Sequence, residues 1–320
     1  MAECDRIPVF AVAGPTASGK TALAVSLAKQ FGGEVVSCDS MQVYRGLSVS
    51  TAKPTPEEMQ GVPHHLLDFL PPQTPFSAAD YCKAAADTIR DIRRRGKNVF
   101  LCGGTGLYMQ SLLDNIDFTG SGANEDLRSS LQELAEKEGN EAVWARLHAA
   151  DPSGAEALHP NNLGRVIRAL EIYEETGLTI AEQHARSRRN PSPYRSFILC
   201  LDFRDRQNLY ARIDRRVDWM LQNGLEAEAR AFYEQYGFDG GTARQAIGCK
   251  ELLPYLRGEI SLQQAAETVK RETRHYAKRQ LTWFRRMDNV HFLYMDETDD
   301  PVAAAAVMAE KFFEKGRCQA

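Results

Sequence analysis

The chain contains a segment whose residue types and spacing could bind phosphate groups. GPTASGKT, residues 14–21, fits the pattern G-x-x-x-x-G-K-[ST] of a phosphate-binding loop. In such a loop the backbone N–H groups and the N-terminus of the next helix bind anionic oxygens. The residues expected to contact phosphate are Gly14, Pro15, Thr16, Ala17, Ser18, Gly19, Lys20 and Thr21, and the Thr21 hydroxyl also suits Mg²⁺. The motif is the usual basis for an ATP-binding or nucleotide-binding assignment, but it specifies a diphosphate or triphosphate and not an adenine.

A second chemical candidate is Asp39, in the segment DSMQVYRG at residues 39–46. Asp39 is expected at the end of the strand that follows the helix of the loop, where it would open onto the phosphate site. Three roles are open for its carboxylate: it could hold Mg²⁺, act as a general base or cap a turn. Gln42 lies three residues further on, and its amide could pair with the edge of an adenine.

The segment GGTGLY, residues 103–108, follows another expected strand. A kinase or ATPase would often place a Mg²⁺-binding aspartate at the end of this strand, but here the strand ends Leu-Cys-Gly-Gly-Thr. Glycines allow a backbone to approach a ligand closely, and Thr105 supplies a hydroxyl there. A plain tight turn accounts for this segment equally well.

Two arginines in the segment NNLGRVIRALEIYEETG, residues 161–177, could reach an anionic ligand. Arg165 and Arg168 are three residues apart on one expected helix, so they share a face. A separate apolar face is formed by Leu163, Ile167, Leu170 and Tyr173. The alternative is a solvated charged face, which is the commoner role of two helical arginines.

A basic helix is expected over residues 267–286, ETVKRETRHYAKRQLTWFRR. Its apolar stripe recurs every three or four residues at Val269, Thr273, Tyr276, Gln280 and Phe284, with Leu281 beside it. The cations off that stripe are Lys270, Arg271, Arg274, Lys278, Arg279, Arg285 and Arg286. This pattern favours a nucleic-acid backbone as partner over an ordinary solvated face. A second basic patch is RSRRNPSPYR, residues 186–195.

An α/β core must position these segments. Apolar runs of strand length are expected at residues 7–14, 34–40, 98–104, 197–203 and 291–296. Helices are expected at residues 21–31, 77–95, 207–236 and 261–287 and at the C-terminus. The β-α-β order predicts a P-loop core, with a mainly parallel sheet flanked by helices on both faces.

The middle of the chain predicts a different kind of structure. Residues 125–189 show helical segments and no convincing strand, and the linker-like stretch TGSGAN precedes them. We therefore expect an inserted all-helical domain at residues 119–195. The first part of the core would be residues 1–118, and residues 196–320 would complete the core with basic C-terminal helices.

Composition places the chain among ordinary globular proteins. It has 320 residues, 43% of them hydrophobic and 26% charged, and a formal charge of −4 that indicates no polyanionic partner by itself. No apolar run is long enough to cross a membrane, and charged residues near the N-terminus occupy the place of a signal peptide's apolar stretch. The seven cysteines form no C-x-x-C pair, which argues against structural zinc and disulfides and predicts a cytoplasmic protein. Nothing compels an oligomer, so a monomer is expected.

In this order the segments resemble the bacterial tRNA dimethylallyltransferases, also called tRNA isopentenyltransferases. The matching pieces extend from residue 14 to residue 286 and are GPTASGKT, DSMQVYRG, STAKPT, PHHLLD, GGTGLY, NNLGRVIRALE, QAIGCKEL and TRHYAKRQLTWFRR. The resemblance implies transfer of a dimethylallyl group from dimethylallyl diphosphate to N6 of adenosine 37, in tRNAs that read U-initial codons. The products would be N6-isopentenyladenosine and diphosphate. It also implies a requirement for Mg²⁺ and an inserted helical domain that contacts the anticodon stem.

The resemblance implies roles for individual residues. Asp39 would accept the N6 proton, Thr16 could donate a hydrogen bond to the bridging oxygen of the leaving group, and Lys20 would help to clamp the diphosphate. Arg165 or Arg168 could add positive charge there. The residues expected to contact tRNA are Asp39, Ser40, Met41, Gln42, Thr105, Leu163, Gly164, Arg165, Val166, Ile167, Arg244, Gln245, Ala246, Ile247, Gly248, Cys249, Lys270, Arg274 and Lys278. The chain departs from the family pattern at Cys249, where tyrosine is common, and at Ser50, where glycine is common, which puts a ring contact at position 249 in doubt.

Two other functions compete with this one. A P-loop small-molecule kinase would hold ATP in the loop and use Asp39 as its base, but it does not explain the basic helix or the missing strand-end aspartate. A nucleotide-gated RNA-binding protein would leave Asp39 and Gln42 at the phosphate site without a use.

Overall fold

The computed structural model describes residues 6–118, 124–237 and 241–314, and most of the linker-like TGSGAN stretch lies outside them. The chain divides into two compact units. The core unit consists of residues 1–113 and 192–320, and the helical unit consists of residues 114–191. The helical unit thus begins and ends a few residues earlier than the insertion expected at residues 119–195.

The core unit is built on one six-stranded sheet in which every neighbouring pair of strands is parallel. The strand order is β3-β2-β4-β1-β5-β6. The strands are β1 (Ile7–Ala13), β2 (Gly33–Ser37), β3 (His64–His65), β4 (Asn98–Gly103), β5 (Tyr194–Asp202) and β6 (Val290–Tyr294). The predicted parallel α/β core is therefore confirmed.

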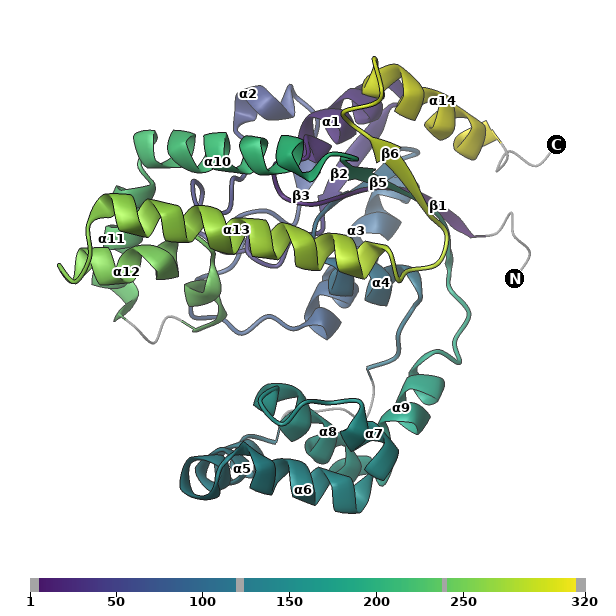
Figure 1. Ribbon diagram of the computed structural model, residues 1–320. Helices are drawn as coiled ribbons and strands as arrows, with labels where there is room; N and C mark the ends of the chain where they lie inside the picture. The colour runs from purple at the N-terminus through teal and green to yellow at the C-terminus, as the bar shows by residue number, and fades with distance from the viewer. Residues whose placement is uncertain (1–5, 119–123, 238–240, 315–320) are drawn as a thin grey trace. The chain divides into compact units, whose positions relative to one another are not determined.

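Helices cover both faces of this sheet (Figure 1). The described helices of the core unit are α1 (Lys20–Gln30), α2 (Pro56–Met59), α3 (Ala78–Arg94), α4 (Gly106–Leu113), α10 (Arg206–Gln222), α11 (Leu225–Tyr236), the 3₁₀ helix η3 (Gly241–Gln245), α12 (Cys249–Leu256), α13 (Leu262–Phe284) and α14 (Pro301–Glu314). Of these, α11, η3 and α12 form a separate hydrophobic cluster with residues that follow β2. Helices α10 and α13 pack against each other, and Figure 1 shows them running alongside one another.

The alternation of side chains along β1 separates two hydrophobic cores. Val9 and Ala11 point into the core formed with α3, α4, α10 and α13. Phe10 and Val12 point to the opposite face, where α1 and α14 pack. Burial on both faces explains why the central strands are continuous apolar runs in the sequence.

Three differences from the expected elements bear on the site. The helical stretch expected at residues 207–236 is broken, because Gly224 has a φ of 98° and begins a new helix, α11. Strand β2 ends at Ser37, so Asp39 lies in the turn beyond it. Strand β5 begins at Tyr194, earlier than expected, because its first residues pair with Ile7 and Pro8 of β1.

The helical unit contains α5 (Glu125–Glu138), α6 (Asn140–Ala150), α7 (Pro152–Glu156), α8 (Leu163–Thr176) and α9 (Ile180–Ser187). Its core is a cluster of apolar side chains around Leu131, Leu147 and Leu170. The fully buried carboxylate of Glu171 accepts hydrogen bonds from Arg128 and from the backbone N–H of Asn124. Burial of an ionised carboxylate is tolerable because these donors replace its water shell.

Candidate active site

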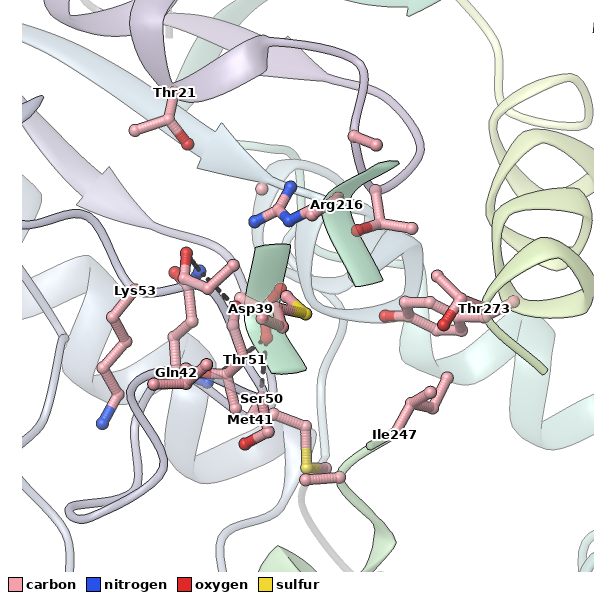
Figure 2. A pocket seen from close by; sticks show the side chains of 18 of the residues that line it. Thr21, Asp39, Met41, Gln42, Ser50, Thr51, Lys53, Arg216, Ile247 and Thr273 are labelled. Atoms are coloured by element: carbon pink, nitrogen blue, oxygen red, sulfur yellow. Dashed lines mark hydrogen bonds between the residues drawn. The ribbon is translucent and has the colours of Figure 1, made fainter. Parts of the chain in front are cut away.

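A cavity of about 670 Å³ lies at the carboxyl ends of β1, β2 and β4 (Figure 2). This is where a parallel α/β sheet is expected to bind its ligand. Its lining comes from residues within 16–22, 39–42, 48–58, 102–103, 213–220, 245–250 and 269–280. Figure 2 shows Gln42, Thr51 and Lys53 on one side of the cavity, with Ile247 and Thr273 on another.

The phosphate-binding loop joins β1 to α1, as the motif predicts. Ala17 has a φ of 62°, a left-handed conformation that is strained for alanine and that turns the loop tightly around the cavity. Lys20 and Thr21, at the start of α1, both line the cavity. Burial lowers the pKa of Lys20, whose Nζ donates to the Pro15 carbonyl at 3.2 Å. Since no carboxylate pairs with Lys20 in the described part of the chain, this buried ammonium suits an anionic ligand.

Asp39 lines the same cavity from the turn after β2. Its Oδ1 accepts from the backbone N–H groups of Met41 at 2.9 Å and Gln42 at 3.3 Å. One carboxylate oxygen therefore serves as a turn cap. No hydrogen bond to Oδ2 is found among the residues the structure describes, so this oxygen can serve a ligand. The turn role and the chemical role are thus compatible.

The turn at Asp39 is tied to the loop that follows β4. The backbone N–H of Ser40 donates to Thr105 Oγ1 at 3.0 Å, and the backbone N–H of Thr105 donates to the Cys38 carbonyl at 3.1 Å. The structure thus brings together DSMQ and GGTGLY, which are about 65 residues apart in the chain. The GGTGLY segment is therefore more than an isolated tight turn.

Gln42 does not present its amide to the cavity in the way the sequence suggested. Its Nε2 donates to the carbonyl groups of Thr51 and Ala52 at 3.1 and 3.2 Å, and its Oε1 accepts from Ser37 Oγ at 3.2 Å. Both ends of the amide are engaged, so pairing with an adenine edge would require these bonds to break. Gln42 instead holds the rim formed by residues 48–55.

The rim is also held from behind by Glu228 of α11. Its carboxylate accepts from three consecutive backbone N–H groups, those of Ser48, Val49 and Ser50, at 2.6 to 2.8 Å. Nothing in the sequence around Glu228 announces this contact, because the two segments are about 180 residues apart. Consecutive backbone N–H groups of this kind form an anion-binding nest, and here the anion is the Glu228 carboxylate of the same chain. The contact positions one wall of the cavity.

Arg216 is a cavity residue that the sequence analysis missed. It lies on α10, three residues after buried Ile213 and four before buried Met220, so it shares their inward face. Burial lowers its pKa, and the carboxylates of Glu58 and Asp39 oppose that effect. An arginine at an apolar-face position was the signal in the sequence that could have identified it.

Helix α13 contributes a wall of the cavity as well as core packing. Val269, Gln280 and Phe284 of the expected apolar stripe are buried. Thr273 and Tyr276, which the stripe placed in the core, are only partly buried and line the cavity.

The basic side chains of α13 differ in whether they are paired with a carboxylate. Lys270 Nζ lies 2.7 Å from the Asp218 carboxylate, and Arg274 forms an ion pair with Asp214, both on α10. Arg285 pairs with buried Asp202. Lys278 is exposed and makes no ion pair among the described residues, so it remains the clearest candidate for a phosphate contact.

The QAIGCKEL segment is only partly available for contact with tRNA. Gln245, Ala246 and Ile247 line the cavity, and Arg244 is exposed. Cys249 is fully buried in a hydrophobic core at the start of α12, so its side chain does not face the cavity, and its predicted contact with tRNA stays a prediction. Burial raises the pKa of the Cys249 thiol to about 12.

The remaining predicted contacts lie on α8 of the helical unit. Val166 and Ile167 are buried in its core, so their side chains pack inside the helical unit, and their predicted contact with tRNA stays a prediction. Gly164 and Arg165 are exposed, and Leu163 is partly buried. Arg168 forms an ion pair with Glu171, which engages its guanidinium within the unit. The predicted role of either arginine at the diphosphate stays a prediction.

The described residues contain no group of three or more His, Cys, Asp or Glu side chains that could hold a metal ion. No helix among them is long and apolar enough to cross a membrane. Cys38, Cys82, Cys102, Cys200 and Cys249 are free thiols, while Cys4 and Cys318 lie outside the described residues.

A family model described as IPP transferase matches residues 42–287. The matched range begins after the phosphate-binding loop, so it does not depend on that widespread motif. The chain is 45% identical over 293 residues to a tRNA dimethylallyltransferase of Thermoanaerobacter sp. (strain X514), covering 91% of this chain and 93% of the relative. It is 46% identical over 288 residues to the tRNA dimethylallyltransferase of Bacillus subtilis (strain 168), covering 90% and 91%.

Solved structures give the same result. A full-length tRNA isopentenylpyrophosphate transferase from Bacillus halodurans matches with a TM-score of 0.73 and 43% identity, and the match covers 97% of each chain. A eukaryotic dimethylallyltransferase acting on tRNA matches with a TM-score of 0.82 and 30% identity, covering 98% of this chain and 80% of that one. Both likenesses extend over the core and the helical unit.

Proposed function

The chain belongs to the IPP transferase family, and from that premise we propose how its cavity carries out the transfer of a prenyl group to tRNA. It is a tRNA dimethylallyltransferase, and the comparisons support this activity over the alternative of a small-molecule kinase. We propose that the donor is dimethylallyl diphosphate and that the acceptor is N6 of adenosine 37 in tRNAs reading U-initial codons. The observation that carries the proposal is one cavity shared by the phosphate loop, Asp39 and Arg216.

The leaving diphosphate needs compensation for the negative charge that it gains. The loop at residues 14–21, Lys20 and Arg216 would hold its oxygens, and both cations are desolvated in the cavity. Thr16 also lines the cavity, and its hydroxyl is proposed to donate to the bridging oxygen. When the C1–O bond breaks, the electron pair leaves with this oxygen.

The attacking nitrogen must lose a proton as it forms the new bond. N6 of adenine is a weak nucleophile because its lone pair is delocalised into the ring, so a base nearby lowers the barrier. We propose that Asp39 accepts the N6 proton as N6 bonds to C1 of the dimethylallyl group. Ser40, Met41 and Thr105 would surround the base, which must leave its stack to reach the site.

The five-carbon group requires an apolar neighbour. Val217, Met220, Ile247 and Val269 line the cavity and come from α10, the segment before α12, and α13. We propose that these side chains receive the dimethylallyl tail while the diphosphate is held by the loop. Apolar contact of this kind excludes water from the reacting carbon.

Mg²⁺ fits the donors of this cavity. The Thr21 hydroxyl lines it, and Mg²⁺ commonly combines one or two protein ligands with substrate phosphates and water. We propose that Thr21 and the diphosphate oxygens hold the ion. Mg²⁺ would neutralise part of the charge on the leaving group.

One assay tests the function. The protein is incubated with unmodified tRNA, Mg²⁺ and either dimethylallyl diphosphate or ATP, and the adenosines are analysed by mass spectrometry. A five-carbon gain on adenosine with the first donor, and no consumption of ATP with the second, is the expected result. Chelation by EDTA should abolish the gain. We propose that the chain works in this way as a monomer in the cytoplasm.

Replacing Thr16 with valine should lower kcat about 10²-fold at saturating substrates, since a donor to the leaving oxygen is lost. The backbone N–H of Thr16 and its partner Gln280 are unaffected by this change. Thr273→Val, which removes a hydroxyl bonded to its own helix on another wall of the cavity, is the control. An effect on KM alone would make Thr16 a ground-state binder.

Replacing Lys278 with glutamine should weaken tRNA binding several-fold and reduce the slope of log K against log salt by about 0.7–0.9. Lys270→Gln should have a smaller effect, because Asp218 and Glu267 already pair with that lysine. Filter binding over a salt series measures both, with exposed Lys311 of α14 as the control position. If only the affinity for dimethylallyl diphosphate changed, α13 would not be a tRNA-binding helix.

A further inference from the structure

Gln280 is a buried amide on α13 that the proposed mechanism does not use. Its side chain is 5% exposed, and its neighbours Ala277, Leu281 and Phe284 on the same helix are buried apolar residues. Its Oε1 accepts from the backbone N–H of Thr16 at 2.9 Å, and its Nε2 donates to the Gly104 carbonyl at 3.0 Å. One amide therefore satisfies a donor in the phosphate loop and an acceptor in the loop after β4.

The Gln280 amide fits against Gly104 only because that position has no side chain. A Cβ placed on Gly104 would lie 2.0 Å from Gln280 Nε2 and 3.2 Å from the Gly14 carbonyl oxygen. Any side chain at position 104 would therefore displace the amide. The close approach of the two loops at this point depends on a glycine on one side and on a group that both donates and accepts on the other.

The contact determines how Thr16 is presented. In a phosphate-binding loop the backbone N–H groups generally face the anion. The N–H of Thr16 instead faces Gln280, which fixes the peptide plane and therefore the direction in which the Thr16 side chain leaves the backbone. The same glutamine holds Gly104, next to Thr105, whose hydroxyl is bonded to Ser40 in the turn of Asp39.

We propose that Gln280 is a positioning residue that sets the geometry of Thr16 against the loop around the acceptor base. It acts through Thr16 and Gly104 and takes no proton itself. It also connects these loops to the helix that carries Lys278. This inference rests on the proposed role of the loop as the diphosphate cradle.

The test compares two variants of the full-length protein. Gln280→Met keeps the length of the side chain but loses both hydrogen bonds, and it should lower kcat about 10²-fold, the size expected of a small misplacement. Its tRNA affinity should stay within about threefold of wild type, because both polar atoms of the Gln280 amide are already bonded to the protein and are not needed by the tRNA. A thermal melt shows whether it is folded.

Gln280→Glu allows a second test, the pH dependence of kcat, which would not change if Gln280 had a purely structural role. An ionised glutamate has no proton to donate, so its oxygen and the Gly104 carbonyl oxygen repel each other. A protonated glutamate accepts from the Thr16 N–H and donates to the Gly104 carbonyl, as glutamine does. Burial raises the pKa of such a carboxyl. The ratio of variant to wild-type kcat should therefore rise as the pH falls from 8 to about 6.

Other titrating and charged groups line the same cavity and would affect both proteins alike: Lys20, Asp39, Lys53, Glu58, Cys102, Arg216, Lys250, Tyr276 and Arg279. Taking the ratio removes their contribution. Gln263→Glu, an exposed position on the same helix, is the matched control and should give a flat ratio. A folded Gln280→Met with wild-type kcat, or a flat ratio for Gln280→Glu, would overturn the inference. Failure of the wild-type protein to transfer the prenyl group would instead contradict the proposed function.

Discussion

Replacing Asp39 with asparagine is expected to lower kcat by about 10³-fold, within the range that general-base catalysis commonly supplies. The reason is chemical and not structural. Asparagine retains an Oδ1 that can accept from the N–H groups of Met41 and Gln42, so the turn survives. Its amide nitrogen cannot accept the N6 proton. Single-turnover transfer with saturating tRNA and dimethylallyl diphosphate measures the effect, and tRNA affinity should stay within about threefold.

Glu58→Gln is the matched control for Asp39, because Glu58 also lines the cavity but caps the short helix α2 through the backbone N–H of Thr55. It should lower kcat far less than Asp39→Asn does. Turnover near the wild-type rate in Asp39→Asn would remove Asp39 as the base. A loss confined to tRNA affinity would make Asp39 a binding residue for the extruded adenosine.

Replacing Arg216 with glutamine is expected to lower kcat by about 10²–10³-fold, because the leaving diphosphate loses a fixed cation. The burial that lowers the pKa of Arg216 also removes the water that would otherwise screen its charge. Arg216→Lys should recover part of the activity, since lysine restores the charge without the planar pair of donors. Arg215→Gln, exposed on the same helix, should leave transfer within about twofold of wild type.

The loss of kcat in Arg216→Gln can be distinguished from a loss of folding. Thermal melts of the glutamine variant in the presence and absence of inorganic diphosphate report whether the folded cavity still binds the leaving group. A variant that is folded, and stabilised by diphosphate as strongly as wild type, would contradict the assignment. In that case Arg216 would be a neighbour of Asp39 that orders the cavity without contacting the substrate.

Much of the fold followed from local patterns. The phosphate loop, the buried strands and the helix at residues 77–95 were predicted because each depends on residues close together in the chain. The break at Gly224 was missed because an apolar pattern continued across it, and only the positive φ of the glycine ended α10. The turn at Asp39 was one of three possibilities, and the structure shows it coexisting with a place in the cavity.

The site was less predictable, because its chemistry depends on partners far away in sequence. Lys270 and Arg274 belong to a basic helix by composition, but the acids of α10 neutralise them. Cys249 follows a segment that lines the cavity, and it turns into the core. Gln280 was counted as part of an apolar stripe, because the loops that use its amide lie 264 and 176 residues away.

The sequence by itself determined the family, the parallel core and the loop between β1 and α1, since motifs of consecutive residues specify local backbone shape and its hydrogen-bonding groups. Only the tertiary structure decided which polar side chains meet in the cavity. Arg216 and Gln280 line it from α10 and α13, and Glu228 of α11 holds its rim from behind. Their roles arise from the packing of α10, α11 and α13 against loops of the sheet, and no pattern of neighbouring residues encodes such long-range contacts.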